Sequence, residues 1–177
     1  MRAGVRLGVD VGSVRVGIAV CDPQGTLATP VETLRRGRGD LDALIRMVDE
    51  RAAVEVVVGL PTTLAGREGI AARAIQAYAE ELAARIMVPI RLVDERLSTV
   101  AAARDLRASG VDSRMGRSVI DQAAAVIILQ GALDAERRSG TAPGRVVAAQ
   151  PAPETGTGTG TGTDETRTTG ATEEAYE

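Results

Sequence analysis

The sequence has 177 residues, of which 44% are hydrophobic, and its formal net charge is −3. This is the composition of a globular chain that can bury a core, and no apolar run is long enough to span a bilayer. All 21 basic residues are arginine, because the chain contains no lysine and no histidine, and Cys21 is its single cysteine. These absences exclude Ser–His and Cys–His nucleophile pairs, imidazole zinc sites, Schiff-base chemistry, a P-loop lysine and an internal disulfide. Catalysis would have to use carboxylates, hydroxyls, backbone groups, arginine or a metal held by oxygen.

Apolar patterning predicts that strands and helices alternate along most of the chain. The N-terminus runs directly into a strand pattern without the apolar region of a signal peptide, so we expect a cytoplasmic protein. Strands are predicted over residues 5–11, 14–22, 29–36, 54–60 and 90–96. Helices are predicted over residues 40–51 and 70–86, from Ser98 or Thr99 to Gly110, and over 118–138, with loops at 61–69 and 111–117.

The order of these elements predicts an α/β fold. Three strands form a meander, and strands then alternate with helices, which indicates a mixed sheet with an antiparallel half followed by parallel strands. After residue 140 the composition changes to a Gly-Thr repeat with an acidic end, so we predict a folded domain over 1–140 and a disordered tail over 141–177. The domain carries 19 arginines and 18 acidic residues, so its net charge is close to zero. It lacks the strongly basic charge that is typical of many nucleic-acid-binding domains.

Three acidic positions stand out from apolar surroundings. Asp121 lies in a helix that is apolar on nearly all sides, on the face expected to meet the sheet, and Asp10 is the one acidic residue in the first strand, between Val9 and Val11. Glu95 ends the fifth strand, beside Asp94. Each has an ordinary structural alternative: a buried aspartate neutralised by backbone donors or arginine, a turn-capping aspartate before Gly12, and solvated charge at a strand end.

A metal site would explain the three carboxylates together. If the first, fourth and fifth strands are adjacent, Asp10 and Glu95 project near one edge of the sheet, and the last helix brings Asp121 against both. Converging carboxylates repel one another and need a cation, and ligation by oxygen alone suits Mg²⁺ or Mn²⁺. Such sites hold substrate phosphates and activate water.

Four segments, in order, resemble the YqgF/RuvX family of the RNase H-like superfamily. They are LGVDVGSVRVGIAV, VVVGLP followed by Gly66 and Gly69, VDERLST, and DQAAAVIILQ. The resemblance implies a three-layer fold in which helices flank a mixed five-stranded sheet. It places an acidic catalytic and metal-binding triad on Asp10, Glu95 and Asp121, with one or two ions left open.

The first functional hypothesis is therefore a Mg²⁺- or Mn²⁺-dependent nuclease. Arg15, Arg96 and Thr99 would contact substrate phosphates, although ordinary surface ion pairs are the alternative for each arginine. The family resemblance implies two substrates. One is the 5′ end of precursor 16S ribosomal RNA, with a ribosomal precursor particle as partner, and we favour it. The other is a branched DNA such as a Holliday junction, which would require a homodimer.

Two further classes remain as rivals. The segment LGVDVG also opens actin-like ATPase domains, but those duplicate the fold around a nucleotide, and no second such hairpin follows here. A ribosomal-RNA-binding protein without catalytic activity would keep the same fold, and the intact acidic triad argues only weakly against it.

Overall fold

The computed structural model describes residues 2–61, 69–94 and 114–147, with only the backbone for residues 114–120. The strands in this part of the chain are β1 (Arg6–Val11), β2 (Arg15–Cys21), β3 (Ala28–Arg35), β4 (Glu55–Leu60), β5 (Ile90–Asp94) and β6 (Arg145–Val147). The helices are α1 (Asp40–Glu50), α2 (Ile70–Ala83) and α4 (Arg114–Ser139).

The strands form one mixed sheet in the order β3-β2-β1-β4-β5-β6. The β1–β2 and β2–β3 pairs are antiparallel, whereas β4 runs parallel to both β1 and β5. The predicted antiparallel half followed by parallel strands is therefore confirmed, as is the adjacency of the first, fourth and fifth strands. The carboxyl ends of β1, β4 and β5 meet at one edge of the sheet, which we call the carboxyl edge.

The prediction of five strands is wrong by one. β6 pairs with β5 in antiparallel fashion and falls inside the range 141–177 that was predicted to be a disordered tail. Three residues in a Pro- and Gly-containing stretch carry too weak a pattern to be recognised as a strand, and their hydrogen bonds are supplied by the open edge of β5. The rest of the predicted tail, residues 148–177, lies outside the described residues.

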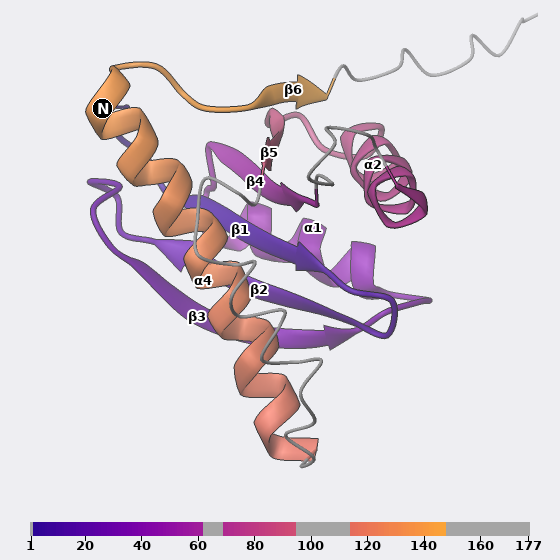
Figure 1. The fold of residues 1–177 in the computed structure, drawn as a ribbon. Helices are drawn as coiled ribbons and strands as arrows, with labels where there is room; N and C mark the ends of the chain where they lie inside the picture. The colour runs from indigo at the N-terminus through magenta and orange to yellow at the C-terminus, as the bar shows by residue number, and fades with distance from the viewer. Residues whose placement is uncertain (1, 62–68, 95–113, 148–177) are drawn as a thin grey trace, which may run out of the picture.

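Two apolar layers cover the sheet. Alternation along β1 sends Leu7, Val9 and Val11 into a core shared with α1 and α2. The opposite face packs against α4 through a second core that includes Val57 and Leu129. Figure 1 shows α4 crossing one face of the sheet, with α1 behind it. The predicted arrangement of a sheet between helices is thus confirmed.

Helix boundaries differ from the predictions at two ends. α4 begins at Arg114, so residues 114–117, predicted to be loop, are helical. α2 ends at Ala83 instead of residue 86. The helix predicted to end at Gly110 lies outside the described residues. No helix in the described parts of the chain is long and apolar enough to cross a membrane.

Candidate active site at the carboxyl edge

Asp10 is a buried charge on the α4 side of the sheet. Its neighbours Val9 and Val11 point into the core under α1 and α2, so alternation directs Asp10 to the opposite face. Gly8 confirms this direction, because a Cβ atom there would meet Leu129 of α4 at 2.6 Å. Asp10 is only 2% exposed. A carboxylate at this depth is costly unless a cation or hydrogen-bond donors compensate its charge.

Gly17 brings α4 close to Asp10. Gly17 is the cross-strand partner of Asp10 in the β1–β2 pair. A Cβ atom on Gly17 would lie 2.1 Å from the backbone oxygen of Asp121, so the helix backbone passes directly over this glycine. Asp121 is therefore one strand away from Asp10 on the same face of the sheet. The proposed convergence of these two carboxylates agrees with this packing.

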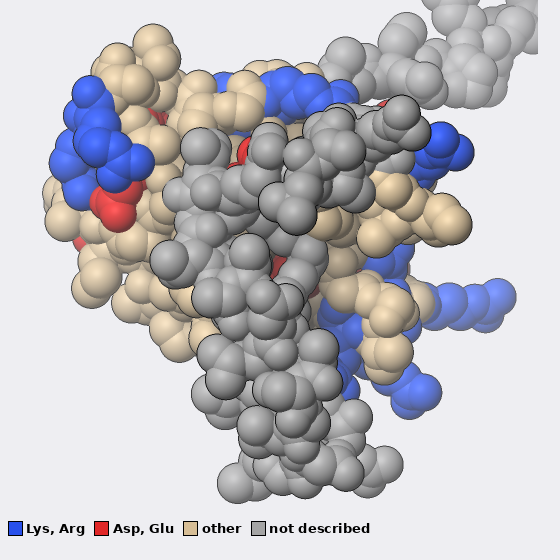
Figure 2. Space-filling view, in the orientation of Figure 1, with Lys and Arg blue, Asp and Glu red and all other residues tan. Residues whose placement is uncertain are grey.

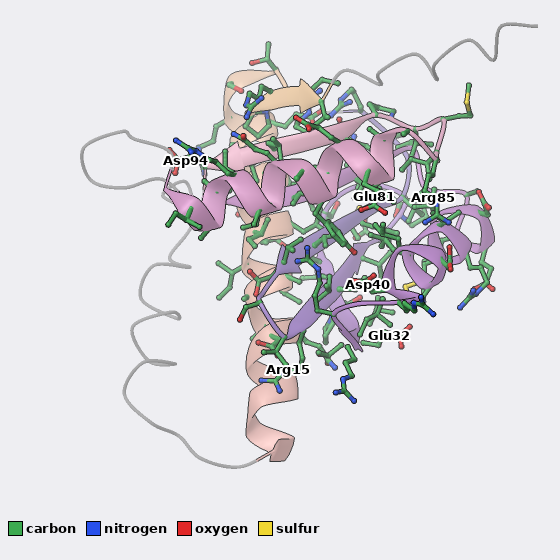
Figure 3. The ribbon with its side chains drawn as sticks, turned by 90° about the vertical axis from the view of Figure 1, so that its right-hand side faces the viewer. Arg15, Glu32, Asp40, Glu81, Arg85 and Asp94 are labelled. Atoms are coloured by element: carbon green, nitrogen blue, oxygen red, sulfur yellow. The ribbon has the colours of Figure 1, made fainter. Side chains whose placement is uncertain are left out.

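Arg15 supplies a positive charge to this pair of acids. Its Nε donates to Oδ2 of Asp121 over 2.5 Å, and the two side chains are 32% and 15% exposed, respectively. Figure 3 shows Arg15 at the foot of the sheet beside α4. Neither terminal nitrogen of Arg15 makes a hydrogen bond within the described residues. Two of its donor groups are thus available to a ligand.

A tight turn fixes the position of Arg15. The amide of Gly12 donates to the carbonyl of Arg15 over 2.8 Å, and a Cβ atom at Gly12 would meet that oxygen at 2.8 Å. Arg36 braces the turn, since its Nη1 donates to the carbonyl of Gly12 over 3.2 Å. The Arg36 guanidinium also lies 4.4 Å from the ring centre of Tyr78 and 3.6 Å from Asp40. The turn between β1 and β2 is therefore anchored to α1 and α2.

The remaining predicted site residues are not in the described part of the chain. Glu95, Arg96 and Thr99 all fall within residues 95–113. Asp94, the last residue of β5, pairs in register with Leu60 at the carboxyl edge. Within the described residues, no group of three His, Cys, Asp or Glu side chains is arranged to hold a metal ion.

A buried charge network at the opposite end of the α4 face was not predicted from the sequence. Arg6 is 1% exposed, and its Nε lies 3.4 Å from Glu55 of β4, which also accepts from Arg91 over 2.9 Å. Arg2 bridges Glu55 and Glu136 of α4 with contacts of 2.9 and 3.0 Å. In the sequence, the only signal of this network is the presence of charged residues at the starts of the first and fourth strands. Their pairing depends on strand order, which the sequence pattern does not display.

The donated hydrogen bonds of Arg2 hold the pKa of Glu136 at about 2, well below its ordinary value. Arg2 gives Glu136 three of them, from its backbone amide, its Nε and its Nη2, at 3.0–3.1 Å. Hydrogen bonds and positive charge stabilise the ionised carboxylate and outweigh its burial. This network joins β1, β4, β5 and α4 far from the carboxyl edge, so its role is structural.

Comparison with known families decides between the classes considered above. A family model described as "RuvX: Holliday junction resolvase" matches residues 4–135. The chain belongs to the RuvX family. The membership expected from the four sequence motifs is therefore confirmed, and an actin-like ATPase is not supported.

Relatives in the RuvX family cover most of this chain. A protein from a Nocardioides species is 57% identical over 153 residues, spanning 83% of this chain and 98% of that protein. A Streptomyces avermitilis protein is 59% identical, spanning 83% and 96%, and one from Thermobifida fusca is 54% identical, spanning 85% and 100%. All three bear the name "Putative pre-16S rRNA nuclease".

Among solved structures, Thermus thermophilus RuvC in complex with a Holliday junction substrate has a TM-score of 0.48 and 20% identity, over 80% of this chain and 99% of that chain. The family description and the names of the relatives both denote nucleases, in agreement with the nuclease hypothesis. They differ in the nucleic acid that they name.

Proposed function

We propose that this chain is a divalent-metal-dependent nuclease that hydrolyses phosphodiester bonds during 5′-end processing of precursor 16S ribosomal RNA. The observation that carries the proposal is the approach of the α4 backbone at Asp121 to Gly17, the cross-strand partner of buried Asp10, which supports a site shared by the two carboxylates. Glu95 is the next residue in the sequence after Asp94, where β5 ends at the same edge of the sheet as β1. The names of the close relatives support ribosomal RNA as the substrate.

The donor chemistry of these residues fits a hard divalent cation. Asp10 and Asp121 offer carboxylate oxygens only, and two neighbouring carboxylates on a largely buried surface favour a cation between them. Asp10, Glu95 and Asp121 would hold the ion. When bound, Mg²⁺ or Mn²⁺ acts as a Lewis acid toward the phosphodiester and promotes ionisation of water.

The arginines would bind and orient the substrate. The terminal nitrogens of Arg15 make no hydrogen bond within the described residues, so its planar guanidinium can meet a phosphate while its Nε stays with Asp121. Arg96 and Thr99 would add phosphate contacts from the segment after β5. In the hydrolysis itself, the oxygen of water bonds to phosphorus and the water gives up one proton, while the bond from phosphorus to the leaving ribose oxygen breaks and that oxygen takes up one proton.

Branched DNA is the second candidate substrate, because the matching family model is described as a Holliday junction resolvase. Cutting two strands symmetrically would require a two-fold dimer of this chain. The ribosomal RNA proposal instead implies a ribosomal precursor particle as partner. Either substrate implies action in the cytoplasm, where bacterial RNA precursors and chromosomal DNA both occur.

Cleavage of two labelled substrates side by side tests the proposal. A precursor ribosomal RNA leader and a four-way DNA junction are incubated with the full chain in Mg²⁺, Mn²⁺ or EDTA. We expect metal-dependent cutting of the RNA leader, and a loss of about 10³-fold or more in Asp121→Asn, as for other residues that act as one catalytic unit. Asp134→Asn is the matched control, since Asp134 lies on the same helix in an exposed ion pair with Arg137.

Two other cleavage results would change the proposal. Preferential cutting of the junction would replace the RNA substrate with branched DNA and leave the site unchanged. Failure to cut either substrate with either metal would overturn the nuclease proposal and favour a binding protein with the same fold.

A further inference from the structure

Arg15 has a basic neighbour on the edge strand of the sheet. Arg15 and Arg35 are directly opposite each other at the ends of β2 and β3. The next pair along, Val16 and Leu34, turns toward the core under α1 and α2, so alternation sends both arginines to the α4 side. Arg35 therefore shares a face with Asp121 and Asp10. Figure 2 shows basic side chains projecting at the lower right of the molecule, near the place where β3 ends in Figure 1.

This placement is unfavourable for the protein alone. Like charges directly opposite each other on adjacent strands destabilise a sheet. Asp121 compensates Arg15, and Arg36 is held by Asp40, Gly12 and Tyr78. Arg35 is exposed and makes neither an ion pair nor a side-chain hydrogen bond with any described residue. An anionic ligand would remove the repulsion between Arg35 and Arg15.

The three side chains lie in order across the sheet. Asp10 is on β1, Arg15 on β2 and Arg35 on β3, and adjacent strands are about 4.8 Å apart. A phosphodiester chain that reaches the carboxylates and continues past Arg15, at the end of β2 that α4 leaves uncovered, would next meet Arg35. The planar donor group of arginine suits phosphate oxygens at both positions.

We infer that Arg35 is a phosphate-binding residue, and that the nucleic-acid backbone leaves the acidic site alongside α4, past the ends of β2 and β3 that carry Arg15 and Arg35. The inference rests on the proposed nuclease function and adds the direction in which the substrate runs. It assigns a role to a residue that the sequence motifs do not include.

The salt dependence of binding tests this inference. The full chain is titrated with the RNA leader and with the four-way junction in EDTA, which prevents cutting, at several salt concentrations. For a duplex substrate, each phosphate contact contributes about 0.9 to the slope of log K against log salt. We expect Arg35→Gln to make the salt dependence weaker, so that the magnitude of the slope falls by about 0.9 for a duplex or about 0.7 for a single strand. Arg35→Lys should restore the wild-type slope.

Arg51→Gln is the matched control. Arg51 is also exposed, but it lies at the end of α1 in a hollow with Val5 and Cys21, at the opposite end of the sheet. Its variant should keep the slope of the wild type. If Arg35→Gln also keeps that slope while the wild type binds, this inference is wrong and the proposed function stands. If the wild type binds neither substrate, both fail together.

Discussion

At the scale of single residues, the contact between Arg15 and Asp121 bears on what the buried aspartate does. The sequence left two interpretations open: a metal ligand, or a core carboxylate neutralised by an arginine. The structure contains the arginine, with its Nε 2.5 Å from Asp121. A purely structural aspartate would need nothing more, and a second buried carboxylate one strand away would then only add repulsion. Asp10 is that second carboxylate, which favours a cation site.

Glu136 gives a prediction for the charge network at the other end of α4. Because its pKa is lowered to about 2 in the folded protein, its pairing with Arg2 stabilises the fold above about pH 4.5 and loses that effect as the pH falls toward 2. Glu136→Gln should lower the free energy of unfolding by about 1–3 kcal/mol at pH 7, because it removes hydrogen bonds to a buried carboxylate from Arg2, which is itself 46% exposed. Urea unfolding at pH 7, 4 and 3 measures this, and the gap between wild type and variant should narrow at low pH.

Glu32→Gln is the control for that measurement. Glu32 is exposed on β3 and makes no ion pair with the described residues. Its variant should follow the wild type at every pH. A difference between the wild type and Glu136→Gln that stays constant from pH 7 to pH 3 would contradict the lowered pKa of Glu136.

At the scale of elements, two glycines decide how closely α4 approaches the sheet. Gly8 lies under Leu129 and Ala125, and Gly17 lies under the backbone of Asp121. With no side chain at these points, the helix backbone packs directly onto the strands, and the Asp121 carboxylate contacts Arg15 of β2. The same packing leaves Ala124 and Ala125 fully buried.

Gly17→Ala should disturb the fold and the site together. The added methyl group would collide with backbone that cannot move without shifting α4, so we expect a loss of about 1–3 kcal/mol in the free energy of unfolding. Urea unfolding measures the loss, and nuclease assays should show reduced cleavage in the folded fraction. Gly69→Ala is the control, because nothing lies within 4 Å of a Cβ atom at Gly69. Equal stability of Gly17→Ala and the wild type would contradict the close approach.

Local sequence patterns predicted some of these elements and missed others. Strong apolar runs such as that of β4, and the helical spacing from Asp121 to Leu129, were sufficient to predict five strands and the inward face of α4. β6 has only three residues, and its partner is a strand more than fifty residues earlier, so no local pattern marks it. The same holds for Glu55 and Glu136, which meet through Arg2 only once strand order is established. Asp10 and Asp121 attracted attention as acidic residues in apolar surroundings, and their convergence was predicted from the expected adjacency of the first, fourth and fifth strands.

At the scale of the whole molecule, charged residues lie at both ends of the α4 side of the sheet, and we assign a structural role to one end and a binding role to the other. At the amino ends of the parallel strands, arginines and glutamates neutralise one another in a largely buried network. At the carboxyl edge, Asp10, Asp121 and Arg15 lie on one face of the sheet, and Arg35 continues the basic surface. This division predicts that variants at the first end change stability, whereas variants at the second change metal and substrate binding.

The most direct test of the account is equilibrium binding of Mn²⁺ to the full chain, followed by the electron paramagnetic resonance of the free ion. We expect wild type and Asp134→Asn to bind alike, and Asp121→Asn and Glu95→Gln each to lose about ten-fold or more in affinity, since even supporting groups of metal sites contribute that much. Unchanged Mn²⁺ affinity in Asp121→Asn would contradict the central claim and leave Asp121 as a core carboxylate paired with Arg15.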